Sequence, residues 1–132
     1  YGIDAPVGIA VDVTHASDYP TVDKRRVGEM KPGKGPVICR GANINPRVFE
    51  MLVEAAEAEG IPYQLEAAGG GTGTDANAMQ LNKAGMATGL VSVPLRYMHT
   101  PCELLHLDDV ENAARLLAAF TRRMKPNTDF TP

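Results

Sequence analysis

GLVSVPLRYMHTPCELLHLDDVENAARLLAAF, residues 89–120, joins an apolar run to a helical pattern through a polar loop. The apolar run predicts a strand over 86–99 that is buried around its centre. The pattern after the loop predicts a helix over 107–124, because apolar side chains recur there at helical spacing. We expect its packed face to consist of Val110, Ala113, Ala114, Leu117 and Phe120. A strand, a polar loop and a helix in this order are typical of α/β proteins, which usually carry their chemistry on such loops.

The rest of the chain repeats this alternation of strands and helices. Strands are predicted over 7–16, 35–41 and 61–68, since each holds a short run of apolar and β-branched residues. A helix is predicted over 45–60, and a glycine-rich turn leads into a short helix within 69–85. This order predicts one α/β domain built on a layered sheet with flanking helices.

The helix over 45–60 has the clearest end signals of the chain. Asn45 can cap it, Pro46 suits its first turn, and Gly60 suits its end. Apolar side chains share one of its faces and predict the buried side, namely Val48, Leu52, Ala55 and Ala56.

Composition excludes several classes of protein. The 132 residues are 44% hydrophobic and 22% charged, with a net charge of −3 and no basic stripe of the kind that nucleic-acid surfaces show. No apolar stretch approaches the roughly 20 residues of a membrane span. Cys39 and Cys102 form no disulfide framework, so a reduced, cytoplasmic setting is expected. We therefore expect neither nucleic acid nor membrane as a partner.

Polar side chains follow the predicted strands at Asp12, within 71–75 and within 96–99. We expect these segments to gather at one edge of the sheet, where α/β proteins usually place their site. Asp12 and His99 are candidate metal ligands, because a carboxylate and an imidazole suit Zn²⁺ or another first-row cation. The alternatives, a hydrogen-bonded turn residue and a structural histidine, stay open at this point.

The glycine-rich segment GGGTGTD, residues 69–75, has two interpretations. Its backbone N–H groups could cradle a phosphate at a helix start, or it could be a structural turn. It is not a Walker loop, because no Lys-Ser/Thr pair follows the last glycine.

Other polar residues near the predicted edge also have two interpretations each. Arg96 could bind a substrate carboxylate or carbonyl, or pair with a nearby aspartate. Glu103 could fix the tautomer of His99, or be a solvated loop charge. His15 and His106 could add metal ligands, although their spacings match no standard local motif.

Four segments together resemble the C-terminal part of the M42 family of metallo-aminopeptidases, which are also called glutamyl aminopeptidases or endoglucanase-like proteins. The segments are VDVTHASDYP (11–20), KGPVI (34–38), IPYQLEAAGGGTGTDANAM (61–79) and VSVPLRYMHTPCE (91–103). The resemblance extends from about Val7 to Leu117. It implies an α/β peptidase domain with two divalent metal ions, zinc or cobalt, that hydrolyses the N-terminal peptide bond of peptides.

Site residues are carried over from the resemblance one by one. Asp12 in VDVT matches an aspartate ligand of one metal ion, and His99 in RYMH matches the histidine ligand of the other. Gly73, Thr74 and Asp75 lie in the GTDA segment, which matches a loop beside the substrate pocket. Here the segment reads GGGTGTDA and is longer than the usual GGTDA form. We expect Arg96 to be a further substrate-binding residue, and Glu103 to support His99.

The resemblance also implies residues that this sequence does not contain. In the family a first histidine ligand, a bridging aspartate and an adjacent pair of glutamates precede the DVT strand, and one of those glutamates is the general base. Residues 1–132 are therefore expected to be the C-terminal part of one catalytic domain, without its N-terminal part and its inserted assembly domain. The chain alone is expected to be inactive.

The resemblance implies three kinds of partner: peptide substrates, the remainder of the same polypeptide, and further copies in a homo-oligomer. Two other functions stay open at this point. The first is a non-catalytic α/β remnant that acts as an assembly or regulatory module. The second is a small phosphate- or nucleotide-binding domain that uses the glycine-rich turn.

Overall fold

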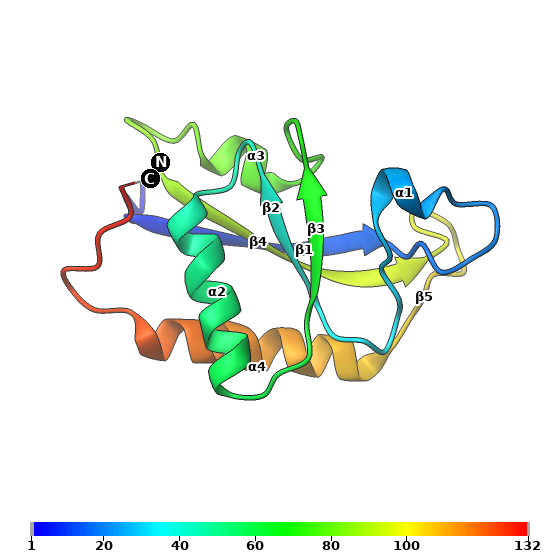
Figure 1. The fold of residues 1–132 in the computed structure, drawn as a ribbon. Coiled ribbons are helices and arrows are strands. Elements are labelled where there is room, and N and C mark those ends of the chain that lie inside the picture. The colour runs from blue at the N-terminus through cyan, green and yellow to red at the C-terminus, as the bar shows by residue number, and fades with distance from the viewer. Residues whose placement is uncertain (1, 132) are drawn as a thin grey trace.

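A single mixed sheet with helices on both faces organises the chain, as the computed structural model shows for residues 2–131 (Figure 1). The predicted fold class, a layered α/β sheet, is confirmed. The strands are β1 (Val7–His15), β2 (Val37–Gly41), β3 (Gln64–Ala68), β4 (Ala87–Arg96) and β5 (Leu104–Leu105). The helices are α1 (Lys24–Val27), α2 (Pro46–Ala58), α3 (Asp75–Met79) and α4 (Leu107–Arg123).

The strand directions differ from the sequence-based expectation. The order is β1-β4-β2-β3, with β1 parallel to β4 and β2 parallel to β3. However, β2 pairs with β4 in the antiparallel sense, through Val37 with Ser92 and Ile38 with Val91. In Figure 1 the two parallel pairs cross, since β1 and β4 run toward the right of the view and β3 runs toward its top. The long strands are thus not all parallel, but residues of the three polar segments still meet in one cleft.

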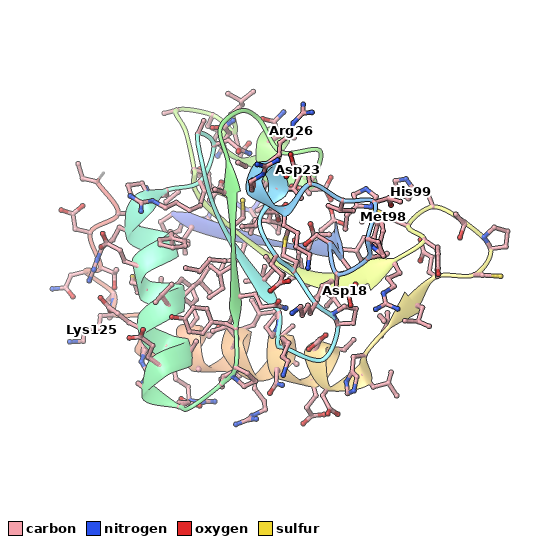
Figure 2. The ribbon with its side chains drawn as sticks, turned by 45° about the vertical axis from the view of Figure 1, so that its right-hand side comes forward. Asp18, Asp23, Arg26, Met98, His99 and Lys125 are labelled. Atoms are coloured by element: carbon pink, nitrogen blue, oxygen red, sulfur yellow. The ribbon has the colours of Figure 1, made fainter. Side chains whose placement is uncertain are left out.

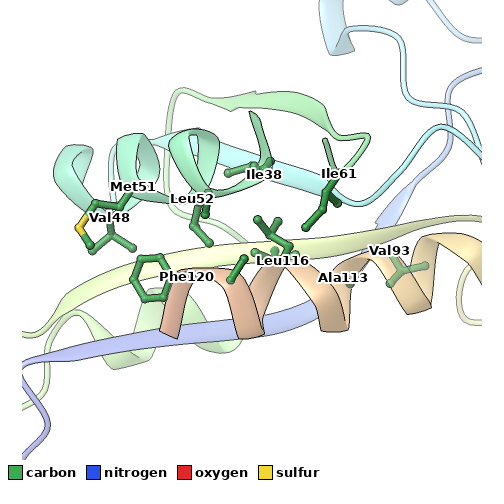
Figure 3. Packing of buried hydrophobic residues seen from close by; sticks show 13 residues of the cluster. Ile38, Val48, Met51, Leu52, Ile61, Val93, Ala113, Leu116 and Phe120 are labelled. Atoms are coloured by element: carbon green, nitrogen blue, oxygen red, sulfur yellow. The ribbon is translucent and has the colours of Figure 1, made fainter. Parts of the chain in front are cut away.

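The main core lies between the sheet and the two long helices, α2 and α4 (Figure 3). Asn45 caps α2, since its Oδ1 accepts hydrogen bonds from the N–H groups of Arg47 at 2.9 Å and Val48 at 3.1 Å. All four residues predicted for the packed face of α2 are buried. The core cluster consists of Ile38, Val48, Met51, Leu52, Ala55, Ala56, Ile61, Val91, Val93, Ala113, Leu116, Ala119 and Phe120.

The packed face of α4 is rotated from the predicted one. Val110 is 44% exposed and Ala114 is also exposed, whereas Asp109 and Leu116 are fully buried. The carboxylate of Asp109 accounts for the rotation, because it accepts backbone N–H groups from the loop before β2. Its two oxygens bind Gly33 N at 2.6 Å and Gly35 N at 2.7 Å.

The opposite face of the sheet is covered only in part. Here the short helix α3 packs its buried Ala76 against Ala10 of β1 and Leu90 of β4. Beyond α3 the strands leave this face open. Sequence reasoning did not predict α1 or β5, which have four and two residues and therefore too little pattern to recognise. No helix among the described residues is long and apolar enough to cross a membrane.

Candidate functional site

A cleft of about 380 Å³ lies over the open face of the sheet. β3 and β4 contribute alternate residues to it, because successive side chains of a strand point to opposite faces, whereas the last four residues of β1 all border it. Two loops border it: the glycine-rich loop after β3, and the loop after β4. The lining residues are Asp12, Val13, Thr14, His15, Cys39, Glu66, Ala68, Thr72, Gly73, Thr74, Leu90, Ser92, Met98 and His99. The cleft thus brings together Asp12, His99 and the GTDA loop, which are distant in sequence.

Asp12 is half-buried on β1, three residues before the strand ends. Its Oδ1 accepts the N–H of Val13 at 2.7 Å, and this bond orients the carboxylate. Within residues 2–131 no other hydrogen bond or ion pair to the carboxylate of Asp12 is present. His15, on the same strand, lines the cleft as well.

His99 stands in a turn with an uncommon backbone (Figure 2). Both Tyr97 and His99 have φ of +62°, a left-handed conformation that non-glycine residues adopt mainly where the surroundings enforce it. Glu103 stabilises this backbone conformation at His99, because its Oε1 accepts the backbone N–H of His99 at 2.6 Å. Glu103 therefore contacts the backbone of His99 and not its ring. The Thr100 hydroxyl donates to the carbonyl of Tyr97 at 2.7 Å and tightens the same turn.

The glycine-rich loop is held to the rest of the fold by a chain of polar side chains. Asn43 Nδ2 donates to Thr72 Oγ1 at 2.9 Å, and Thr72 and Thr74 share a second hydrogen bond of 2.9 Å. A Cβ atom added at Gly70 or Gly73 would meet nothing within 4 Å, so packing inside the described chain does not require glycine there.

Asp75 begins α3 and does not line the cleft. The loop shares the cleft with the carboxylates of Asp12 and Glu66, whose charge opposes a bound phosphate.

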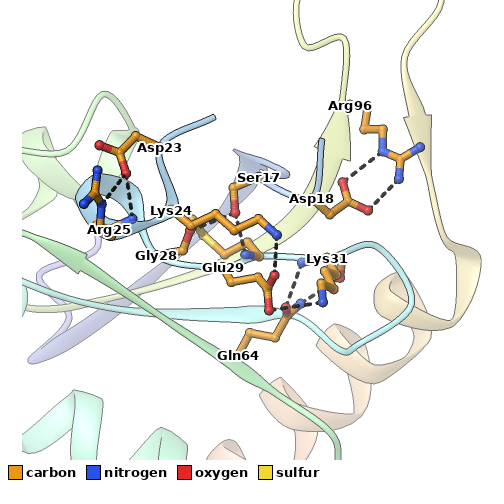
Figure 4. Close-up of polar contacts among 11 residues, drawn as sticks. Ser17, Asp18, Asp23, Lys24, Arg25, Gly28, Glu29, Lys31, Gln64 and Arg96 are labelled. Atoms are coloured by element: carbon orange, nitrogen blue, oxygen red, sulfur yellow. Dashed lines mark hydrogen bonds and ion pairs between the residues drawn. The ribbon is translucent and has the colours of Figure 1, made fainter. Parts of the chain in front are cut away.

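Arg96 lies outside this cleft and pairs with Asp18 (Figure 4). Its Nε and Nη2 donate to the two carboxylate oxygens at 3.0 and 2.5 Å. The hydrogen bond from Arg96 holds the pKa of Asp18 below its ordinary value. Of the two interpretations of Arg96, the structure shows the aspartate pair; substrate contact by this guanidinium stays a prediction.

Glu66 is a cleft residue that sequence reasoning missed. It sits on β3 opposite Cys39, and Thr14 Oγ1 donates to its two carboxylate oxygens at 3.2 and 3.3 Å. Burial, and after it the negative charge of Glu66, raises the pKa of the Cys39 thiol to about 11. The alternation of polar and apolar residues in YQLEAA could have indicated Glu66. When this strand is considered alone, however, its polar side chains are assigned to solvent.

The donors in the cleft fit divalent metal ions only in part. Carboxylate and imidazole groups bind zinc and other first-row cations, and Asp12 and His99 line one cleft. No group of three or more His, Cys, Asp or Glu residues among the described ones is arranged to hold an ion by itself. Asp12 and His99 could therefore each supply only one ligand to an ion, and other residues would have to supply the remaining ligands.

The sequence profile of the M42 glutamyl aminopeptidase family matches residues 1–116. The chain belongs to the M42 family. Lysyl aminopeptidase from Pyrococcus furiosus is 46% identical to this M42 chain over 132 residues, which are all of this chain and 37% of that protein. The chain thus spans little more than a third of the length of that relative.

Solved structures agree with this assignment. An aminopeptidase from the archaeon Desulfurococcus kamchatkensis superposes with a TM-score of 0.86 at 44% identity, over 96% of this M42 chain and 36% of that one. The TET1 peptidase of Pyrococcus horikoshii, which can assemble into a tetrahedron or a large octahedral shell, gives a TM-score of 0.66. It is 30% identical, over 88% of this chain and 33% of its own.

Proposed function

We propose that residues 1–132 form the C-terminal part of the catalytic domain of a two-metal aminopeptidase, which hydrolyses the N-terminal peptide bond of peptides. The observation that carries this proposal is the meeting of Asp12, His99 and the GTDA loop in one cleft of an M42 chain. These groups come from three separate segments of the chain.

In this proposal Asp12 holds one divalent ion and His99 holds the other, with zinc or cobalt as the metal. When bound, the two ions supply Lewis acidity to the scissile carbonyl and lower the pKa of a water molecule. The remaining ligands and the general-base glutamate come from the rest of the polypeptide. Residues 1–132 alone are therefore inactive.

The chain's own residues contribute position and shape. The β1 strand fixes Asp12, and the strained turn supported by Glu103 fixes His99 at the same cleft. Rigid elements of this kind hold ligands more precisely than free loops. Gly73 and Thr74 border the cleft and would contact the peptide backbone, while Asp75 is the first residue of α3 and does not line the cleft.

Two further elements of the proposal concern the surroundings of the site. Arg96 lies outside the cleft and can contact substrate only if Asp18 releases its guanidinium, so we do not assign it to the reacting groups. The complete enzyme forms a homo-oligomer, a proposal supported by the shells of the P. horikoshii relative. We place it in the cytoplasm, since the chain has no disulfide framework.

The test is metal content and hydrolysis in the complete gene product. Asp12→Asn and His99→Ala should each lose about one metal ion per subunit by inductively coupled plasma mass spectrometry. Each should also reduce hydrolysis of leucyl-p-nitroanilide by about 10³-fold or more, and EDTA should do the same to the wild type. His106→Ala is the matched control, because His106 caps α4 outside the cleft and should retain both ions.

The competing function, a non-catalytic assembly or regulatory module, predicts a different set of results. It requires that the complete wild-type protein hydrolyse no aminoacyl substrate at any metal loading, while it still assembles in size-exclusion chromatography with light scattering. Full metal content in both site variants would also reject the assignment of Asp12 and His99.

A further inference from the structure

Glu66 stands where two hollows of the molecule meet. The first is the cleft that holds Asp12 and His99. The second, of about 350 Å³, lies between the end of β1 and the segment that follows it. Three residues line both hollows, namely Thr14, His15 and Glu66. The two hollows therefore adjoin at Glu66, whose carboxylate borders both.

The second hollow has apolar walls. Val22, Val27 and Met30 line it, together with the ring of Tyr19. This wall is held in place through Ser17, whose hydroxyl donates to the carbonyl of Gly28 at 2.9 Å and accepts the N–H of Met30 at 2.8 Å (Figure 4). The hollow is thus a shaped feature of the fold, although Val27 is 46% exposed.

The carboxylate of Glu66 lacks a cationic partner among residues 2–131. Its oxygens accept only the hydroxyl of Thr14, at 3.2 and 3.3 Å, which are long distances for a bond between a hydroxyl and a carboxylate. A half-buried carboxylate is stabilised far more by a cation that donates to it directly than by a neutral hydroxyl. Apolar walls beside one carboxylate match a side chain with a methylene stem and a cationic head, as in lysine and arginine.

We propose that Glu66 is a specificity-determining residue that binds the cationic side chain of the substrate's N-terminal residue, lysine or arginine. The methylene stem lies against the wall formed by Val22, Val27 and Met30, and the cationic group donates to Glu66. Substrates with an N-terminal glutamate or aspartate are disfavoured, because their carboxylate meets that of Glu66. This inference rests on the proposed aminopeptidase function and adds its substrate class.

The test compares two substrates that share an aliphatic stem and differ in charge. Lysyl- and norleucyl-aminomethylcoumarin are hydrolysed by the complete, metal-loaded gene product, and kcat/KM is measured for each. Wild type should prefer the lysyl substrate by about 10- to 100-fold, the range of a charge-assisted hydrogen bond. Glu66→Gln should remove most of this preference and leave kcat/KM for the norleucyl substrate within about threefold.

The control is Glu111→Gln, an equal change of charge on the exposed surface of α4, which packs on the opposite face of the sheet. It should leave the lysyl preference unchanged. Inhibition gives an independent measurement: free L-lysine should compete better than L-norleucine in wild type and equally well in Glu66→Gln.

The outcomes separate this inference from the function on which it rests. If wild type hydrolyses neither substrate, the proposed function fails. If wild type hydrolyses norleucyl and lysyl substrates equally, only the specificity of Glu66 is refuted. If Glu66→Gln slows both substrates equally, Glu66 binds a group common to them, such as the α-ammonium, and the inference is wrong.

Discussion

Replacing Asp109 by asparagine should remove a large share of the stability of the fold. The side chain is fully buried, and its two oxygens accept the N–H groups of Gly33 and Gly35 at 2.6 and 2.7 Å. Asparagine keeps one acceptor oxygen and turns an N–H₂ group toward the other backbone donor. One hydrogen bond to a charged acceptor, about 1.5–3 kcal/mol, is lost, and one buried donor is left unpaired. We expect a loss of about 2–4 kcal/mol, against a typical total of about 5–15 kcal/mol.

Urea unfolding followed by circular dichroism measures this loss. The midpoint should fall by about 1–2 M while the slope stays unchanged. Asp108→Asn is the matched control, because Asp108 occupies the same first turn of α4 with a side chain that is 80% exposed. It should lose less than about 1 kcal/mol. Equal losses in the two variants would refute the conclusion that the buried carboxylate ties the loop before β2 to α4.

Three further perturbations have defined outcomes. Gly35→Ala should destabilise the fold by about 2–3 kcal/mol or more in thermal unfolding, because Gly35 has φ of +96° and an added Cβ would collide with a backbone carbonyl. Gly70→Ala, in open space, should change stability by less than about 1 kcal/mol, and equal effects would contradict the geometry. The native pKa of Asp18 lies below the ordinary 3.8, so its stabilising contribution is present above about pH 4 and is lost as pH falls through the native pKa. Asp18→Asn should therefore flatten that part of the acid-unfolding curve and cost about 1 kcal/mol at pH 7; an unchanged curve would reject the ion pair. In thiol labelling at pH 8, exposed Cys102 should react in the native state and Cys39, with its pKa near 11, only after unfolding; rapid labelling of both would contradict the burial of Cys39.

The sequence allowed the regular elements to be predicted because their signals are local. Asn45 and the apolar face of α2 lie within a few turns of one helix, and both were predicted correctly. The alternation of strands and helices likewise predicted the layered fold. The rotation of α4 was not predictable in this way, because the partner of Asp109 lies more than 70 residues away in the loop at Gly33 and Gly35.

The candidate site shows the same limit. Asp12 and His99 were selected from motifs, and the structure places both in one cleft, although their role as ligands stays a proposal. The polar segments meet in one cleft as expected, but the direction of β2 against β4 was not predictable, because no local pattern encodes the pairing of these strands. Glu66 was missed for a related reason: its neighbours across the cleft become visible only when the order of the four long strands is known.

The alternation of side chains along the strands has a consequence for how such an enzyme can diversify. Leu90 and Ser92 of β4 line the cleft, whereas Val91 and Val93 of the same strand belong to the core cluster with α2 and α4. Residues that border the cleft and residues that maintain the core thus alternate within one strand and point to opposite faces of the sheet. In the proposed enzyme, single substitutions on the cleft side change the cleft while the hydrophobic layer remains intact. A one-residue insertion in a strand would instead exchange the two sets and destroy both properties together.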